Sequence, residues 1–309
     1  MARRALVIAN RHSRRGRDRL GAVLERLRAG GMELDLAEPR GGRRGIGRLI
    51  RERAAGSDLV VLGGGDGTMN AAAEALLETG LPLAILPLCT GNDLARTLGI
   101  PLDPLAAADV IAGGGGARRI DLGRVNGKHF FNVASVGLST RVAAALTGEA
   151  KRRLGTLSYP VTVYRVLREG RTFRAEIRPG EEGDGGGGPA APLALETIQL
   201  AVGNGRFYGG GLVVDERAEI DDRLLHLYAL RPQPLWRLAS RALAFRRGRH
   251  DDPGAVEALA GRSFEVVTDR PMRVNTDGEI TTRTPARFSV VPAALEVLVP
   301  APTPPGGEA

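Results

Sequence analysis

The turn of residues 63–68, with the sequence GGGDGT, combines residue types that can hold phosphate. Consecutive glycines let a backbone adopt positive φ angles and approach a ligand closely. The helix expected after the turn would present free N–H groups and the positive end of its dipole, and both favour an anion. Asp66 would repel a phosphate in this loop unless a cation lay between them. The turn therefore predicts a site for a nucleotide with Mg²⁺.

Two other glycine-containing nucleotide motifs do not fit this chain. The phosphate loop G-x-x-x-x-G-K-[ST] is absent, because the only Gly-Lys pair, Gly127-Lys128, is followed by His129. The dinucleotide pattern G-x-G-x-x-G also fails, since Thr68 stands where its last glycine would be. The alternative that remains is a glycine-rich connection between strand and helix that binds nothing, which is common in proteins.

The elements around this turn predict a parallel α/β layer. The apolar run Leu59–Leu62 precedes the turn as a strand, and Met69–Thr79, rich in Ala, Leu and Glu, follows it as a helix. The other expected strands are Ala5–Ala9, Met32–Ala37 and Leu83–Leu86, and the other expected helices are Asp18–Ala29 and Ile46–Arg53. Ligands of such sheets bind at the carboxyl ends of the strands, where residues 63–68 and 87–93 would both lie.

After the glycine run of residues 113–116, the pattern changes to strands separated by loops. A helix is expected within Glu149–Arg168. The expected strands are Ile120–Val125, His129–Ser135, Phe173–Ile177, Glu196–Gly203, Leu224–Leu230, Ser263–Thr268, Met272–Thr276 and Phe288–Val299. The predicted fold class is therefore α/β, with an N-terminal Rossmann-like parallel domain over residues 1–120 and a β-rich domain over residues 121–290. Residues 291–309 are expected to return to the first domain.

Composition and charge limit the classes of function. A chain of 309 residues suits two domains of ordinary size. The net charge of +8, carried almost wholly by arginine, favours an anionic partner such as a nucleotide, a nucleic acid or an acidic membrane. An aromatic content of 4% without zinc-type spacing argues against a nucleic-acid module. The single cysteine, Cys89, excludes an intramolecular disulfide and agrees with a reducing compartment, and no apolar run reaches the roughly 18 residues of a membrane span.

The segment Arg231–Arg249 predicts a basic amphipathic helix that carries the only tryptophan, Trp236. Its apolar stripe would ordinarily pack on its own domain. Contact with an anionic membrane through its arginines is the alternative.

Seven short segments follow one another along the chain in a recognisable order. They are residues 64–68 (GGDGT), 87–96 (PLCTGNDLAR), 132–138 (NVASVGL), 155–159 (GTLSY), 203–211 (GNGRFYGGG), 219–224 (EIDDRL) and 277–279 (DGE). In this order they resemble the motifs of the bacterial diacylglycerol kinase and lipid kinase family. The resemblance implies an ATP-binding α/β domain, a C-terminal β-sandwich-like domain and an active site in the cleft between them.

The resemblance also implies roles for individual residues. Asp66, Asp93 and Asp121 correspond to an acidic network that acts with water and Mg²⁺, and Glu279 corresponds to the general base. A separate structural Mg²⁺ corresponds to Glu219, Asp222 and the carbonyl of Leu224. The nucleotide-binding positions that correspond are Asn10, Ser13, Gly63, Gly64, Gly65, Asp66, Gly67, Thr68, Asn70 and Thr90.

The chain departs from the family's pattern at three places. The first nucleotide loop, usually Asn-Pro-x-Ser-Gly, reads NRHSR at residues 10–14, so only Asn10 and Ser13 carry over. The usual Asp-Asp-Gly of the structural Mg²⁺ loop has Arg223 in place of glycine. A threonine expected after the second strand is Ala37 or Glu38.

The function that this resemblance implies is transfer of the γ-phosphate of ATP, with Mg²⁺, to a lipid hydroxyl, with diacylglycerol giving phosphatidic acid as the leading reaction. The implied partners are a lipid at the membrane surface, an anionic membrane and a second copy of the chain, with no nucleic acid. The implied location is cytoplasmic, peripheral at the inner membrane face. Three alternatives stay open: a kinase for a sphingoid base, monoacylglycerol or polyprenol, an NAD kinase, and a nucleotide sensor without turnover.

Each acidic residue also has an interpretation without catalysis. Asp93 could cap a helix at Leu94–Thr97, and Asp121 could be a turn residue at a strand end. The pair Asp277-Gly278 is a common hairpin turn, which would leave Glu279 an ordinary strand residue.

Overall fold

The computed structural model describes residues 3–9, 14–89, 91–145, 158–169, 171–180, 191–205, 207–208, 212–213, 218–234 and 256–301. The chain divides into two compact units, of which unit 1 contains Met1–Asp121 with Ala293–Ala309 and unit 2 contains Leu122–Pro292. Two strands, β5 (Gly116–Val125) and β18 (Ala286–Val299), contribute residues to both units.

Unit 1 is built on a parallel sheet with the strand order β2-β1-β3-β4-β18. The first four strands are β1 (Arg3–Ala9), β2 (Met32–Ala37), β3 (Leu59–Gly64) and β4 (Leu83–Pro87). The C-terminal part of β18 extends the sheet, with Val297 opposite Leu83. Every residue of β3 is buried, which explains why this central strand reads as an unbroken apolar run.

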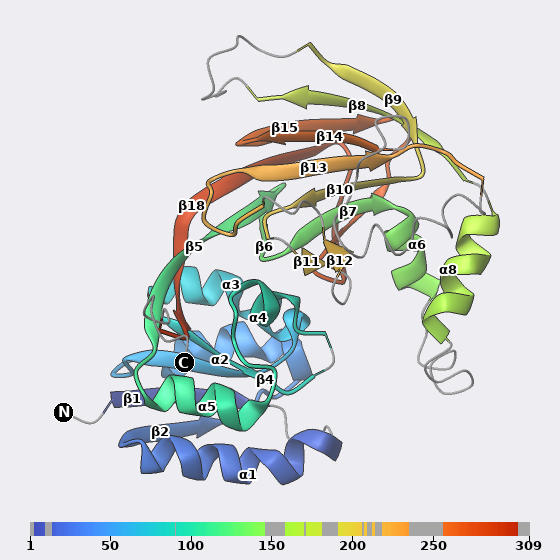
Figure 1. Cartoon of the computed structure of the whole chain (residues 1–309). Coiled ribbons are helices and arrows are strands. Elements are labelled where there is room, and N and C mark those ends of the chain that lie inside the picture. Colours follow the sequence, from blue (N-terminus) through green and yellow to red (C-terminus); the bar gives the residue numbers. More distant parts are fainter. Residues whose placement is uncertain are drawn as a thin grey trace, which may run out of the picture. The chain divides into compact units, whose positions relative to one another are not determined.

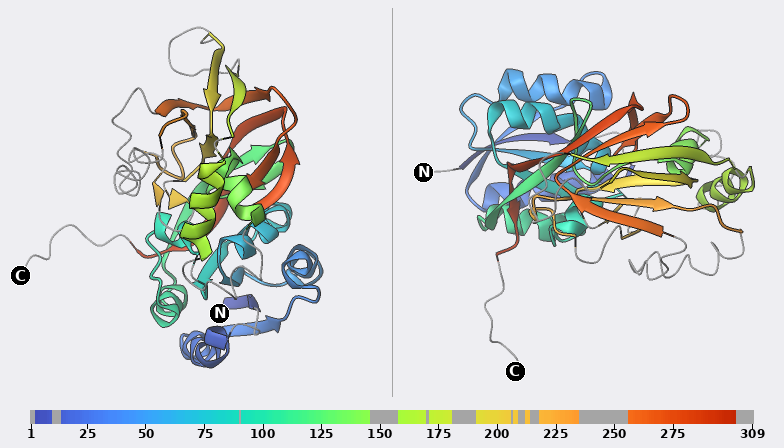
Figure 2. Two further views of the ribbon diagram at one scale, coloured as in Figure 1. Left: turned by 90° about the vertical axis from the view of Figure 1, so that its right-hand side faces the viewer. Right: turned by 90° about the horizontal axis from the view of Figure 1, so that it is seen from above.

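Helices cover both faces of this sheet (Figures 1 and 2). On one face α1 (Arg14–Ala29) packs against α5 (Pro104–Ala112), and on the other α2 (Ile46–Arg53) packs against α3 (Asp66–Thr79). The short helices η1 (Gly42–Gly45) and α4 (Asp93–Thr97) complete unit 1. The predicted parallel α/β layer is thereby confirmed.

Local sequence explains where these helices begin and end. The carboxylate of Asp103 accepts the N–H groups of Leu105 and Ala106, and Pro104 occupies the first helical position of α5. Helix α3 ends at Gly80, whose φ of 66° is the left-handed conformation that glycine adopts without strain.

Unit 2 contains two antiparallel sheets. One has the order β18-β15-β8-β9 and the other β14-β13-β10-β7-β16-β17. Their strands are β7 (Val133–Gly137), β8 (Phe173–Pro179), β9 (Leu193–Thr197), β10 (Gln199–Gly203), β13 (Leu225–Leu230), β14 (Val256–Gly261), β15 (Ser263–Thr268), β16 (Arg273–Thr276) and β17 (Glu279–Arg283). The short strands β6 (Lys128–Phe130), β11 (Phe207–Tyr208) and β12 (Leu212–Val213) pair outside these orders.

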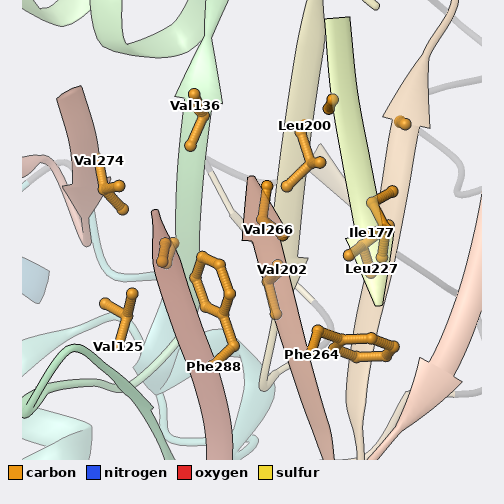
Figure 3. Close-up of a cluster of buried hydrophobic side chains, with 14 of the residues drawn as sticks. Val125, Val136, Ile177, Leu200, Val202, Leu227, Phe264, Val266, Val274 and Phe288 are labelled. Carbon is orange, nitrogen blue, oxygen red and sulfur yellow. The ribbon is translucent and has the colours of Figure 1, made fainter. Parts of the chain in front are cut away.

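The core of unit 2 lies between its two sheets. Figure 3 shows Phe264, Val266 and Phe288 of the first sheet among side chains of the second, including Val136 and Leu200. All of these side chains are buried. Apolar side chains that meet from two antiparallel sheets define a β-sandwich, and the predicted β-rich second domain is therefore confirmed.

Two predicted strands are each two strands in the structure. The predicted strand Glu196–Gly203 breaks at Ile198, because β9 belongs to one sheet and β10 to the other. The buried hydroxyl of Thr197 stabilises this change of sheet, because its single O–H is shared between the carbonyls of Gln199 and Leu230. The predicted strand His129–Ser135 likewise divides into β6 and β7. Apolar and β-prone residues lie on both sides of each break, so the composition carries no sign of the breaks.

Other elements differ in extent or were not predicted. Helix α8 (Ser158–Arg168) begins inside the predicted range Glu149–Arg168, and residues 149–157 lie outside the described residues. Strands β14 and β17 and the helices α5 and α6 (Leu138–Ala145) were not predicted. Residues 235–249 of the expected basic helix also lie outside the described residues. Among the residues that are described, no helix is both long enough and apolar enough to cross a membrane.

Candidate active site

The glycines of residues 63–67 bring three segments of unit 1 into close contact. A Cβ on Gly63 would lie 2.8 Å from the Cβ of Ala9 on β1, and a Cβ on Gly65 would lie 2.4 Å from the carbonyl oxygen of Gly91. None of the glycines in this turn has a positive φ, and Gly65 is extended with φ −120°. The expectation that they supply positive φ angles is therefore wrong, and their requirement here is close approach of the backbone.

Asp66 joins the glycine turn to the loop that follows β4. Its Oδ2 accepts the N–H of Asp93 and its Oδ1 accepts the N–H of Leu94, both at 3.0 Å. Because these are the first N–H groups of α4, a carboxylate from another loop supplies the cap of that helix. Asp66 is half-buried and is the first residue of α3.

Asp93 and Asp121 are nearly inaccessible to solvent. Asp93 is 4% exposed, is the first residue of α4 and forms an ion pair with Arg96 at 3.1 Å. Asp121 is 2% exposed and lies inside β5, where its Oδ1 accepts the N–H of Ala293 at 2.7 Å. The capping role considered for Asp93 belongs to Asp66, and Asp121 is not at a strand end.

Arg43, a residue of η1 that sequence reasoning missed, has its side chain against the first turn of α3. A Cβ on Gly67 would be 2.0 Å from the Nη1 atom of Arg43, so the guanidinium lies directly against the backbone of the turn. Partial burial raises the pKa of the nearby Cys89 thiol, the positive charge of Arg43 lowers it, and the negative charge of Asp66 raises it. A guanidinium beside a helix N-terminus adds positive potential where an anion would bind. No sequence signal separates Arg43 from the many other arginines.

Of the other residues predicted to bind the nucleotide, two lie in α3 and three lie outside the residues that the structure describes. Thr68 and Asn70 lie half-buried in the first turns of α3, and the Thr68 side chain is within 2.2 Å of the position of a Cβ on Gly64. Asn10, Ser13 and Thr90 lie outside the described residues.

A pocket of about 240 Å³ opens at the carboxyl ends of β1 and β2. Ala9 in its wall also contacts the position of a Cβ on Gly63, which places the pocket next to the glycine turn. Its lining side chains are apolar apart from that of Glu38, and the lining residues are Val7, Ala9, Leu20, Leu24, Leu36, Ala37 and Glu38.

In unit 2, Asp277 and Gly278 form the turn of the β16–β17 hairpin, with φ angles of 47° and 95°. Glu279 is the first residue of β17, is half-buried, and pairs with Thr276 across the hairpin. The Asp277 carboxylate accepts the N–H groups of Phe131 at 2.7 Å, Asn132 at 3.0 Å and Val133 at 3.1 Å. The turn is thereby attached to the connection between β6 and β7. The backbone directly before Glu279 is held in place by these hydrogen bonds.

The loop of Glu219, Asp222 and Leu224 is also in unit 2. The Oδ2 of Asp222 accepts the N–H of Glu219 at 3.1 Å and lies 2.8 Å from the Nε2 of His226, while its Oδ1 accepts the N–H of Leu224 at 2.8 Å. Arg223 has a φ of 62°, a conformation in which the glycine of the usual motif would be unstrained. A metal at Asp222 would have to share this carboxylate with His226, and the role of this loop stays a prediction.

The oxygen atoms around Asp66 suit a Mg²⁺ ion that is held partly by water and phosphate, and they do not form a complete site made of protein ligands alone. A carboxylate offers about four acceptor positions, and Asp66 uses one on each oxygen for α4. Mg²⁺ is commonly held by one or two carboxylates, with waters and substrate phosphates as its other ligands. Among the described residues no group of three or more His, Cys, Asp or Glu side chains could hold a metal alone. The residues present therefore fit a cation that arrives with a nucleotide.

Comparisons with known proteins agree over nearly the whole chain. Residues 4–125 match the diacylglycerol kinase catalytic domain and residues 132–299 match the YegS C-terminal NAD kinase β-sandwich-like domain. A Pseudomonas aeruginosa protein named “Probable lipid kinase YegS-like” is 38% identical over 267 residues, which cover 83% of this chain and 82% of the relative. A Klebsiella pneumoniae protein of the same name is 35% identical over 246 residues, covering 79% and 78%. The crystal structure of a diacylglycerol kinase from Bacillus anthracis str. Sterne, 24% identical, has the same fold, with a TM-score of 0.78 over 96% of each chain.

Proposed function

The chain belongs to the YegS-like lipid kinase family, and from this premise we propose that it transfers the γ-phosphate of ATP to the hydroxyl of diacylglycerol, giving phosphatidic acid. The observation that carries the proposal is the bond pattern of Asp66. Its carboxylate connects the glycine turn to the loop after β4, so two loops that could contact a nucleotide are held together by a group that attracts Mg²⁺.

We propose that unit 1 binds ATP at the carboxyl ends of its parallel strands. The phosphates would lie at the turn of residues 63–68, where the N-terminus of α3 and Arg43 both favour negative charge. The base would enter the pocket beside Ala9, whose volume of about 240 Å³ is below the roughly 300 Å³ at which pockets for drug-sized ligands begin. We propose that this volume holds one ring system and that the Glu38 carboxylate accepts a hydrogen bond from a ribose hydroxyl.

Phosphoryl transfer needs the γ-phosphate positioned and its charge neutralised, because the protein contributes little covalent chemistry. A bound Mg²⁺ would supply positive charge that offsets the negative charge of the phosphates. Asp66 and Asp93 would hold this ion together with waters. Asp121 would act beside them as the third member of the acidic network.

We assign Glu279 as the general base for the lipid hydroxyl. A carboxylate is a weak base for an alcohol, so it acts only within hydrogen-bond reach of the hydroxyl and as the phosphoryl group moves. The anchored turn at Asp277 restricts the backbone directly before Glu279, which is what a positioned base requires. An apolar acceptor with one hydroxyl would come from the membrane surface, and we propose that the protein binds peripherally at the inner face.

The experiment is incubation of the purified protein with labelled ATP and Mg²⁺ in three parallel reactions, containing vesicles with diacylglycerol, vesicles made from a total lipid extract, or NAD. Labelled phosphatidic acid in the first reaction supports the proposal. A different labelled lipid in the second would correct the substrate, labelled NADP would support the rival enzyme, and ATP binding without turnover would support a sensor.

Glu279→Gln tests the assignment of the base. Loss of general-base catalysis typically lowers the rate by about 10² to 10⁴, and ATP binding should be nearly unchanged because the nucleotide loops belong to unit 1. Glu176→Gln is a matched control, since Glu176 is a strand glutamate of the same unit that pairs with Arg178. Weakened ATP binding with an intact rate at saturation would remove Glu279 from this role.

A further inference from the structure

The loop of residues 218–224, called the Asp222 loop, leads into β13 and is closed by hydrogen bonds to one carboxylate. The Oδ2 of Asp222 accepts the N–H of Glu219 at 3.1 Å, and its Oδ1 accepts the N–H of Leu224 at 2.8 Å. The N–H of Asp222 in turn donates to the carbonyl of Glu219 at 3.5 Å. The backbone of the loop therefore turns around the side chain of Asp222.

A histidine of β13 adds a further hydrogen bond to this carboxylate. The Nε2 of His226 lies 2.8 Å from the Oδ2 of Asp222. Because an ionised carboxylate can only accept, Nε2 is the donor in this bond. His226 is 8% exposed, and its strand lies between β10 and β14, with Gly203 and Ala260 opposite it (Figure 1). The imidazole is therefore held by an inner strand of the sheet and shielded from water.

The structural Mg²⁺ that the sequence implies would bind at the same carboxylate. A carboxylate offers about four acceptor positions, and those of Asp222 already accept from Glu219, Leu224 and His226. Mg²⁺ demands nearly ideal octahedral geometry, with oxygen ligands at about 2.0–2.1 Å. An ion on Oδ2 would displace the imidazole, and an ion on Oδ1 would have to fit beside the N–H of Leu224. The residues present therefore do not fit this ion.

Arg223 is a second feature of the loop that opposes a cation. It stands where the usual motif has glycine, and its φ of 62° is a conformation that glycine adopts without strain and arginine rarely adopts. Arg223 is exposed, and its guanidinium is always charged. An ion at Asp222 would have to bind next to this permanent positive charge.

We propose that the imidazole of His226 replaces the divalent cation in the Asp222 loop, so that unit 2 of this chain folds without a structural metal. The ring N–H offers its positive pole to the carboxylate that a cation would bind. Because His226 belongs to β13, the same bond attaches the loop to the sheet. The proposal does not rest on the kinase reaction, and it confines the Mg²⁺ requirement of the protein to the nucleotide site of unit 1.

Binding of the metal alone is the first test. Every protein carries Asp66→Asn, so that the site in unit 1 does not contribute, and no nucleotide is present. Electron paramagnetic resonance measures bound Mn²⁺, which takes the same oxygen ligands as Mg²⁺. The protein with an unaltered Asp222 loop should bind no more Mn²⁺ than the protein that also carries Asp222→Asn. A bound Mn²⁺ ion that disappears with Asp222→Asn would overturn the proposal.

Arg223→Gly with His226→Leu should create the metal site that the natural loop lacks. Glycine removes the positive charge and adopts the φ of 62° without strain. Leucine fills the buried space of the ring but donates no hydrogen bond, so Oδ2 regains a position for a cation. This protein should bind a Mn²⁺ ion, and addition of Asp222→Asn should abolish the binding. Failure of the double variant to bind Mn²⁺ would overturn the proposal, because removal of the imidazole would then admit no ion.

Hydrogen exchange over residues 218–230 tests the bond between the loop and β13. In the unaltered protein, protection of the N–H groups of Glu219 and Leu224 should be equal with Mg²⁺ and with EDTA. His226→Leu should accelerate their exchange by about 10- to 150-fold, which corresponds to the loss of a hydrogen bond to a charged group, about 1.5–3 kcal/mol. His129→Leu alters a half-buried histidine of β6 in the same unit and is the matched control.

Two results of the exchange experiment would overturn the proposal. One is protection that depends on Mg²⁺ in the unaltered protein, and the other is equal exchange in His226→Leu and His129→Leu. None of these measurements uses turnover. Absence of lipid phosphorylation would therefore reject the kinase reaction and leave this proposal standing, while a metal bound at Asp222 would reject this proposal and leave the kinase reaction standing.

Discussion

Replacement of Asp277 tests whether the turn before Glu279 is held by its carboxylate. Asp277→Gly is the sharpest change, because glycine adopts the φ of 47° found here without strain while the carboxylate and its three hydrogen bonds to backbone N–H groups are removed. Asp277→Asn keeps the size, tolerates the same backbone conformation and retains one acceptor oxygen. The two variants therefore separate loss of all acceptors from loss of the charge.

The magnitude follows from the burial of the donors. Phe131, Asn132 and Val133 are 0%, 3% and 9% exposed, so water replaces the carboxylate poorly at their N–H groups. A buried donor left without an acceptor costs about 1–3 kcal/mol, which suggests a destabilisation of about 3–5 kcal/mol for Asp277→Gly when some hydration is allowed. Asp277→Asn should cost about 1–2 kcal/mol. Against a total stability of about 5–15 kcal/mol, the first change is severe.

Hydrogen exchange measured by mass spectrometry over residues 128–137 reads this effect directly. Asp277→Gly should abolish protection at the amides of residues 131–133, and kcat should fall while ADP binding in unit 1 is retained. Asp269→Gly removes an exposed aspartate of the same unit that pairs only at the surface with Arg270, and it should change neither quantity. Equal protection in Asp277→Gly and Asp269→Gly would refute the reasoning.

Three further predictions concern unit 1. Asp66→Asn should lower turnover by orders of magnitude and shift its Mg²⁺ dependence. Circular dichroism should stay unchanged, because the remaining oxygen can still cap α4. A loss of turnover of only a few-fold, with unchanged Mg²⁺ dependence, would reject a metal role for Asp66. Arg43→Gln should weaken ADP binding, measured by calorimetry, by about 10- to 150-fold, since a charge-assisted hydrogen bond contributes about 1.5–3 kcal/mol. Arg44→Gln beside it should leave ADP binding unchanged. The raised pKa of Cys89 keeps its thiol protonated at neutral pH, so alkylation of Cys89 should accelerate only above the pH at which a free thiol titrates. The pH at which alkylation reaches half its maximal rate should rise in Arg43→Gln, which removes a cation, and fall in Asp66→Asn, which removes an anion.

Much of unit 1 could be predicted because its inner strands β1, β3 and β4 are buried over most of their length and its turns carry clear turn residues. The bounds of β2 and α2 agree with the predicted Met32–Ala37 and Ile46–Arg53, where apolar pattern and turn residues coincide. Unit 2 was predicted less well because a sandwich strand and its continuation in the other sheet are both rich in apolar, β-prone residues. The break at Ile198 depends on hydrogen bonds from Thr197 to Gln199 and Leu230, and the partner in β13 is far away in the chain.

The candidate site shows the same limit at the level of single side chains. The types of Asp66 and Asp93 indicated metal and phosphate chemistry, but their relation depends on a contact between loops separated by a strand and a helix. Arg43 is placed by the packing of η1 on α3, a tertiary contact that no local pattern encodes. Sequence therefore indicated the chemistry of the site, while the groups that support it appeared only with the fold.

The Asp277-Gly278 turn shows why a structural and a catalytic interpretation of one motif need not compete. A hairpin turn was one interpretation, with Glu279 an ordinary strand residue, and a general base at Glu279 was the other. The structure contains the turn, yet its aspartate is bound to three backbone N–H groups of another segment. A base must be held within about half an ångström of its productive position, and a side chain on a free hairpin would lose that position through motion of the turn. An anchored turn directly before the glutamate supplies this restraint, so the feature that argues for a simple hairpin is also what a positioned base would need.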